Sequence, residues 1–265
     1  MAVAAVLLEL YRAELPLSAS SAFVTHGAST ACVLLTGWIL CCATIEFVAA
    51  NVPAVRASKL QSDEKARGDT RLRTLAVHYV VRQWVTIFAQ AILFAPLLKA
   101  AFPLHQVQPT AIMTARQYGS FFAIWLVSND FLFTVFHRLF HEVPWLYRVA
   151  HKEHHTWRAP FAWMSHAMSA WEAAANGIAL MAYPTVHALW LRRATPLELV
   201  WACQLIGQLI GCIEHSGYDA LHPLLLVNPK RFPVWLFSTT KHHDDHHRLT
   251  RGNYGGYCTS PCGTR

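Results

Sequence analysis

The stretch YGSFFAIWLVSNDFLFTVFHRLFH, residues 118–141, joins a long apolar run to two histidines. At about 1.5 Å per helical residue, the run from 118 to 136 crosses nearly all of a hydrocarbon core of about 30 Å. His137 and His141 follow at a spacing of four, which places both imidazoles on one face of a helix. The stretch predicts a membrane helix that delivers two imidazoles to one membrane surface, either as metal ligands or as interfacial side chains.

The composition of the whole chain agrees with a membrane protein. Of 265 residues, 54% are hydrophobic and only 14% are charged, whereas soluble domains carry about a quarter charged residues. Further apolar runs occupy 30–50, 84–102, 173–191 and 197–213. The net charge is +7, but no basic stretch interleaved with aromatic residues appears outside these runs, which argues against a nucleic-acid partner. The charge instead favours basic loops beside an anionic leaflet.

The order of the runs predicts where the histidines lie. The polar connection 51–82 carries seven Lys or Arg, so the positive-inside rule places it in the cytosol. The chain then crosses outward at 84–102 and returns at 118–136. A hairpin at 173–213, whether it spans or only dips into the bilayer, brings the later histidines back to the same face.

We therefore expect an all-α, multi-pass membrane protein with a cytosol-facing, helical histidine metal domain. Residues 1–117 are expected to form an N-terminal anchor region with two transmembrane helices. Residues 118–265 are expected to form the catalytic region, including the membrane hairpin.

Histidine is the outlier of the composition, with 16 copies. HKEHH at 151–155 and the last part of KHHDDHH at 241–247 share the spacing H-x-x-H-H, and EHSGY adds one histidine at the end of an apolar run. The spacing predicts imidazoles aligned along a helical face, and His242 is expected to be a neighbour, not a ligand. The predicted metal ligands are His137, His141, His151, His154, His155, His215, His243, His246 and His247.

Nine imidazoles exceed the needs of one zinc ion, which is usually four-coordinate, so they indicate two metals. Imidazole suits iron, zinc, copper and nickel, and the ligand type leaves the metal open. A bound imidazole usually donates its second N–H to a carboxylate or carbonyl. Asp130, two helical turns before His137, and Asp244 are the expected carboxylate partners.

The motifs D-x6-HRxxH, HKxHH, HSGYD and HHDxHH followed by GNY, from Asp130 to Tyr257, resemble the sterol desaturase/fatty acid hydroxylase superfamily. These are membrane histidine-box enzymes with a non-haem diiron centre. HKEHHTWRAPFA at 151–162, MSAWE at 168–172 and EHSGYD at 214–219 are most similar to the cholesterol 25-hydroxylase/methylsterol monooxygenase branch.

The resemblance implies an endoplasmic-reticulum enzyme whose nine histidines, on the cytosolic side, are both the metal ligands and the catalytic residues. It implies two iron ions (zinc in the isolated protein), O2, and electrons from NAD(P)H through cytochrome b5 or a reductase. The implied substrate is a lipid, above all a sterol, that becomes hydroxylated or desaturated. The alternatives are a fatty-acyl or sphingolipid hydroxylase on the same scaffold and a non-catalytic, zinc-binding membrane protein.

Two features depart from the resemblance. Many members carry a further histidine where this chain has Gly211, so His187 or His166 remain alternative ligands from elsewhere. The superfamily also continues from the last histidine motif into an aromatic Trp-Asp element, which GGYCTSPCGTR at 255–265 lacks.

Overall fold

The computed structural model describes residues 23–61, 70–102, 113–191, 195–221 and 239–256. These residues are helical without a β-strand, apart from one isolated bridge between Lys59 and Tyr218. The α-helices are α2 (Ser29–Asn51), α3 (Pro53–Ala57), α5 (Thr70–Leu93), α6 (Ala95–Ala101), α7 (Ala115–Glu142), α8 (Pro144–Leu146), α9 (Ala170–Thr185), α10 (Leu197–His215) and α11 (Thr240–Leu249). The short π- and 3-10 helices are η1 (Phe23–Ala28), η3 (Tyr147–His151), η4 (His154–Thr156), η5 (Ala162–His166), η6 (Val186–Trp190) and η7 (Asp219–Leu221).

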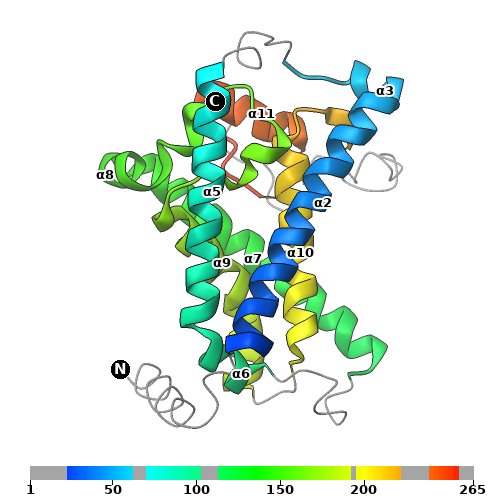
Figure 1. The fold of residues 1–265 in the computed structure, drawn as a ribbon, viewed down its shortest axis with the longest axis vertical. Helices are drawn as coiled ribbons and strands as arrows, with labels where there is room; N and C mark the ends of the chain where they lie inside the picture. Colours follow the sequence, from blue (N-terminus) through cyan, green and yellow to red (C-terminus); the bar gives the residue numbers. More distant parts are fainter. Residues whose placement is uncertain (1–22, 62–69, 103–112, 192–194, 222–238, 257–265) are drawn as a thin grey trace.

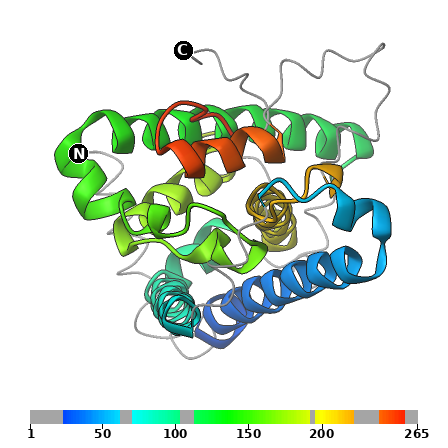
Figure 2. The same ribbon diagram turned by 90° about the horizontal axis from the view of Figure 1, so that it is seen from above.

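Helices α5 and α10 run along the longest axis of the molecule, α2 and α7 are inclined to it, and α11 lies near one end (Figure 1). Seen from that end, α7 and α2 line opposite edges, with α5 and α10 nearly end-on and α11 beside α7 (Figure 2). This arrangement places the histidine-bearing segments 147–156 and α11 at one end of a helical bundle.

Three helices in the described part of the chain are long and apolar enough to cross a membrane: His26–Asn51, Ala115–Glu142 and Leu197–His215. Large apolar side chains on each of them face outward, including Phe47 at 68% exposure and Val127 at 63%. Such exposure is costly in water and natural in lipid. The all-α, multi-pass membrane class expected from the sequence is therefore confirmed.

The run expected at 84–102 differs from the observed helices. Helix α5 already begins at Thr70, inside the predicted polar connection, and the chain breaks between α5 and α6 at Phe94. Pro96 stands in the first turn of α6, where its missing N–H costs nothing, although it could not continue α5. Likewise the run at 173–191 is divided between α9 and η6, and neither run is among the three candidate spans.

Polar caps fix the starts of the helices that carry the site. The Thr114 hydroxyl accepts from Gln117 N–H while the Gln117 side chain accepts from Thr114 N–H, a capping box at the start of α7. Ser169 caps α9 by accepting from Glu172 N–H. At α11 the Nδ1 of His242 accepts from Thr239 N–H at 3.0 Å. His242 is thus a helix cap, consistent with its expected exclusion from the ligands.

Helix α10 packs between α2 on one side and α7 on the other. Cys212 of α10 and Cys42 of α2 are fully buried with their sulfurs 3.7 Å apart, and Trp38 of α2 donates from Nε1 to Ser165 Oγ in η5. On the other side, Phe121 and Trp125 of α7 pack with Leu199 and Cys203 of α10. Helix α10 is thereby fixed against both neighbours, which sets the position of His215 at its end.

Candidate metal centre

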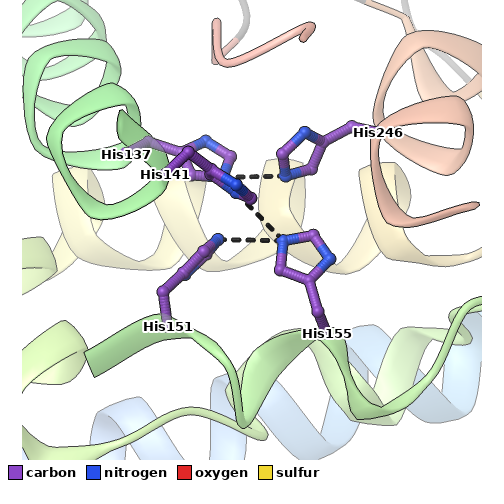
Figure 3. A group of neighbouring side chains, drawn as sticks. All are labelled: His137, His141, His151, His155 and His246. Atoms are coloured by element: carbon purple, nitrogen blue, oxygen red, sulfur yellow. Dashed lines mark hydrogen bonds between the residues drawn. The ribbon is translucent and has the colours of Figure 1, made fainter. Parts of the chain in front are cut away.

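All nine predicted ligands converge in the structure, and they form two groups. The five-histidine group draws on α7, η3, η4 and α11, and its ligand nitrogens lie within 4.8 Å of one another (Figure 3). Its members are His137, His141, His151, His155 and His246. The four-histidine group draws on η4, α10 and α11 and consists of His154, His215, His243 and His247.

In the five-histidine group, the Nε2 atoms face one another. His137 Nε2 lies 3.0 Å from His246 Nε2. His155 Nε2 lies 3.0 Å from that of His151 and 3.1 Å from that of His141. Three separate segments therefore aim their ring nitrogens at a common point.

The four-histidine group has the same geometry. His215 Nε2 lies 3.1 Å from His154 Nε2 and 3.0 Å from His243 Nε2, and His243 Nε2 lies 3.2 Å from His247 Nε2. All four side chains are buried. Both groups thus present converging nitrogens, and in this one the side chains are buried away from solvent.

The contacts of the Nδ1 atoms, which point away from the two groups, explain why the Nε2 atoms point inward with free lone pairs. In five of the nine rings Nδ1 lies against a backbone carbonyl, which accepts only an N–H, so the proton sits on Nδ1 and the Nε2 lone pair is free. These Nδ1-to-carbonyl distances are 3.1 Å for His137 to Tyr254, 3.3 Å for His154 to Ala167, 2.7 Å for His215 to Gly211, 2.7 Å for His246 to Gly252 and 3.2 Å for His247 to Trp157.

A metal ion fits these residues. When the protons sit on Nδ1, the Nε2 atoms of His137 and His246, and those of His215 and His154, face each other at 3.0 and 3.1 Å with their lone pairs and no hydrogen between them. A cation at the common point satisfies them, because metal–nitrogen bonds of about 2.0–2.1 Å bring neighbouring ligand nitrogens to about 3 Å. The donor set, all imidazole, suits iron and zinc alike.

Burial keeps the ligand imidazoles neutral. It lowers the pKa of His151 to about 3, and it lowers the pKa of His154 below its ordinary value. For His243 burial and the nearby imidazoles, first of them His215, hold the pKa well below the ordinary value. The neutral form is the one that ligates a metal, so the site is prepared for metal at neutral pH.

Glu172 is a carboxylate partner that the sequence argument missed. Its Oε1 accepts from His151 Nδ1 at 2.9 Å, and both side chains are almost completely buried. Burial raises the pKa of Glu172 to about 7 although nearby His154 lowers it. The available signal was the single acid in MSAWE next to an apolar run, since an acid there needs a partner.

The two predicted carboxylates lie elsewhere around the centre. Asp244 accepts from Gln61 Nε2 at 2.7 Å. Asp130 is buried against the segment that supplies the Gly252 and Tyr254 carbonyls, because a Cβ placed on Gly256 would come 2.5 Å from its Oδ1. Their support of the ligands stays a prediction.

The alternative ligands His187 and His166 belong to neither group. His187 Nδ1 lies 2.7 Å from Thr195 Oγ1, beside the ring of Phe121. His166 stacks on Trp84 with ring centroids 5.5 Å apart. Gly211, at the position where a histidine was expected, supplies its carbonyl to His215 instead.

The spacing H-x-x-H-H predicted three rings along one helical face, but the structure divides the three rings of each motif between the two groups. His151 and His155 enter the five-histidine group while His154 enters the other, and α11 repeats this with His246 against His243 and His247. Segment 147–156 is also a π-turn followed by a 3-10 turn instead of one α-helix. Each motif therefore bridges the two groups.

Comparisons with known proteins agree with this centre. The fatty acid hydroxylase family matches residues 121–261. A cholesterol 25-hydroxylase-like protein of Danio rerio is 32% identical over 137 residues, 51% of this chain and 49% of that protein. Cholesterol 25-hydroxylase-like protein 2 of Danio rerio is 28% identical over 80% of this chain and 71% of its own length.

Human cholesterol 25-hydroxylase is 32% identical over 51% of this chain and 46% of its own length. The chain thus spans about half the length of two of these three relatives. No solved structure matches. With a family match that covers both histidine groups and more than half of the sequence, the chain belongs to the fatty acid hydroxylase family and is similar to its cholesterol 25-hydroxylase branch.

Proposed function

We propose that this protein is an O2-dependent oxidoreductase that holds two iron ions and hydroxylates a membrane lipid, most specifically a sterol. The observation that carries the proposal is the convergence of nine imidazoles into two groups with inward Nε2 atoms. The sterol is favoured by the relatives, which are named cholesterol 25-hydroxylases. Desaturation of the lipid and a fatty-acyl or sphingolipid substrate are the alternatives on the same scaffold.

The roles of the residues follow from their contacts. The five-histidine group would hold one ion and the four-histidine group the other, and the nine ligands would be the catalytic residues. The metal pair would supply the stepwise electron transfer that reduction of O2 requires. The balance is R–H + O2 + NAD(P)H + H⁺ giving R–OH + H2O + NAD(P)⁺, with electrons delivered by cytochrome b5 or a reductase.

The surrounding protein orients and protects the ligands. The carbonyls of Gly211, Gly252 and Tyr254 fix the tautomer of three rings, and Glu172 does so for His151. The burial of eight of the nine side chains limits access of water. A site of this kind favours oxidation of a bound lipid over loss of oxidising equivalents to solvent.

We further propose that residues 1–117 serve as the anchor region and 118–265 as the catalytic region, in the endoplasmic-reticulum membrane with the centre on the cytosolic face. The division is functional, because the regions share contacts. Arg82 pairs with Glu153, and Gln61 donates to Asp244. Helices of the first region therefore brace the histidine segments of the second.

The test is expression of the chain in membranes, with metal content, reductant-dependent O2 consumption and oxidised lipids measured together. His246→Ala removes a ligand from α11, and His242→Gln on the same helix is the matched control because Gln keeps a capping acceptor. We expect product from the wild type and from the control, and none from His246→Ala. Equal product from His246→Ala and the wild type contradicts the proposal.

The same experiment separates the alternatives. Supplying sterols and acyl lipids in parallel identifies the substrate class by the oxidised product. Bound zinc together with no O2-dependent product in any lipid would favour the non-catalytic metal-binding alternative.

A further inference from the structure

Helix α10 carries a polar stripe that ends at the centre. Gln204, Gln208, Gly211 and His215 follow at spacings of four, three and four, so all lie on one helical face. The stripe runs along a candidate membrane span. Amides inside a spanning helix are costly in lipid unless they are satisfied, so the stripe needs an explanation.

The two amides point into the bundle but are incompletely satisfied. Gln204 Nε2 donates to Met181 Sδ of α9 at 3.3 Å. Gln208 Oε1 is 3.6 Å from the position a Cβ would take on Gly37 of α2. Within the described part of the chain, the Oε1 atoms of both glutamines are buried without a hydrogen-bond partner. The stripe thus faces the space between α9 and α2 with two unused acceptors.

Between these amides and the centre the stripe is open. A Cβ built on Gly211 meets no atom within 4 Å, and the Gly211 carbonyl already holds His215 Nδ1. At 1.5 Å per residue, His215 lies about 10 Å from Gln208 and about 16 Å from Gln204 along the helix axis. The free acceptors therefore lie about two to three helical turns from His215 of the four-histidine group.

The chemistry of the acceptors selects the ligand. A carbonyl oxygen accepts hydrogen bonds and cannot donate one, so its partner must carry an O–H or N–H. A position near the middle of α10 admits a small polar group and opposes a charged or bulky head group, which would be costly at that depth. Ketones, esters and plain hydrocarbons lack the donor. A lipid alcohol with an otherwise apolar body meets all of these conditions.

We propose that Gln204 and Gln208 bind the hydroxyl of a lipid alcohol, whose aliphatic end passes Gly211 to reach the metal centre. The proposal rests on the hydroxylase function above and names the residues that would determine its specificity for the hydroxyl of the substrate. It also sets the position of oxidation, which is a carbon about 10–16 Å from the existing hydroxyl along the α10 axis.

Equilibrium binding without O2 or reductant tests this apart from turnover. Metal-loaded protein in lipid nanodiscs is titrated with a sterol and with the matching steroid that lacks the hydroxyl. Gln204→Met and Gln208→Met, alone and combined, keep side-chain length and remove the acceptor. Leu209→Met, on the exposed side of the same helix, is the matched control.

The wild type and the control should bind the alcohol about tenfold more tightly, as expected for one hydrogen bond to a buried acceptor. The double variant should bind both ligands equally, with unchanged metal content and thermal stability. A preference that persists in the double variant, or equal binding by the wild type, overturns the proposal. A preference in the wild type without any oxidised product refutes the hydroxylase function and leaves the lipid site intact.

Gly211→Leu gives a second, independent test. The backbone carbonyl to His215 remains, so metal content should stay at the wild-type value while alcohol binding falls at least tenfold. Gly119→Leu on α7, where a Cβ also meets nothing within 4 Å, is the control and should bind as the wild type does. Unchanged alcohol binding by Gly211→Leu contradicts the route along the stripe.

Discussion

The two histidine groups share one chemistry but differ in their support. The four-histidine group is buried throughout, and three of its rings direct Nδ1 to carbonyls, those of Gly211 in α10 and of Trp157 and Ala167 in loops. The five-histidine group includes the partly exposed His141, on which Tyr254 stacks at 5.0 Å. Two of its rings depend on carbonyls of the segment that follows α11.

Because their support differs, the two groups should respond separately to substitution. The four-histidine group has one imidazole fewer than the five-histidine group, so the loss of one side chain removes a larger share of its donors. The five-histidine group has one ligand more, and it relies on an irregular segment in which Thr250, Gly252 and Asn253 have positive φ. One group is therefore sensitive to loss of a ligand, and the other to disturbance of its support.

The largest expected effect comes from removing one ligand from each group. His215→Ala should lower the metal content from about two ions to about one per chain, because only three imidazoles remain in the smaller group and the affinity for its ion falls. His141→Ala should retain about two ions, since four ligands remain. Elemental analysis of the purified variants measures this, and equal losses in both variants would show that the groups are not separate sites.

Acidification tests a property that both groups share, which is that their imidazoles are neutral in the folded protein. The pKa of His151 is near 3 in the folded protein, against about 6.5 in an unfolded chain. The unfolded state therefore binds the proton first, and metal-free protein should lose stability as the pH falls from about 6.5 toward 3, by up to about 1.4 kcal/mol per unit of pKa difference. Above pH 7 this contribution should be flat.

Thermal unfolding of the metal-free protein at pH 7.5, 6.5 and 5.5 measures the pH effect. The melting temperature should fall slightly between the first two values and more between the last two, and metal should raise it most at the highest pH. A melting temperature that rises on acidification would contradict neutral ligand imidazoles.

Loss of the Glu172 carboxylate should weaken the five-histidine group alone. Glu172→Gln should lower its metal affinity about 10- to 100-fold, as is typical when an outer partner of a ligating histidine is removed. Competition with a chelator measures the release of metal from each group as a separate step. The step that is missing in His215→Ala belongs to the four-histidine group. Glu142→Gln is the control, because Glu142 is an exposed partner of Arg138 and exposed ion pairs contribute about 1 kcal/mol or less. Equal weakening by the two variants argues against the positioning role of Glu172.

The smallest effect is expected from the segment after α11. Gly256→Ala would place a Cβ 2.5 Å from Asp130 Oδ1 and 3.3 Å from Phe133 Cδ1, so the segment must shift along with the carbonyls that orient His137 and His246. The metal affinity of the five-histidine group should fall by up to about tenfold. Gly119→Ala, with open space around it, should leave both release steps unchanged. A shift in the four-histidine step instead would refute the assignment of this segment.

Helical spacing predicted nine histidines that the structure brings together, but not how they divide into two groups. The i, i+4 pairs His137/His141, His151/His155 and His243/His247 each stay within one group, as their shared face requires. The i+3 members, His154 and His246, join the other group. On α11 the directions of His243 and His246 differ by about 60°, whereas His154 is displaced by the irregular π- and 3-10 turns of its segment. Only the packing of α7, α10 and α11 decides which group each ring joins.

The supporting contacts were less predictable because they join distant parts of the chain. His151 meets Glu172 from 21 residues away, and Gln61 reaches Asp244 across 183 residues. The carbonyl acceptors are invisible to sequence patterns, since every residue has one. The membrane class was predictable from hydropathy, whereas the break at Phe94 depended on the local effect of Pro96.

The most direct test of the account is to count and characterise the metal in protein reconstituted with iron. Elemental analysis combined with X-ray absorption at the iron edge should find about two ions per chain, bound by nitrogen at about 2.1 Å. One ion or fewer per chain in the wild type, or sulfur ligands at about 2.3 Å, would contradict the claim that nine histidines form two metal sites.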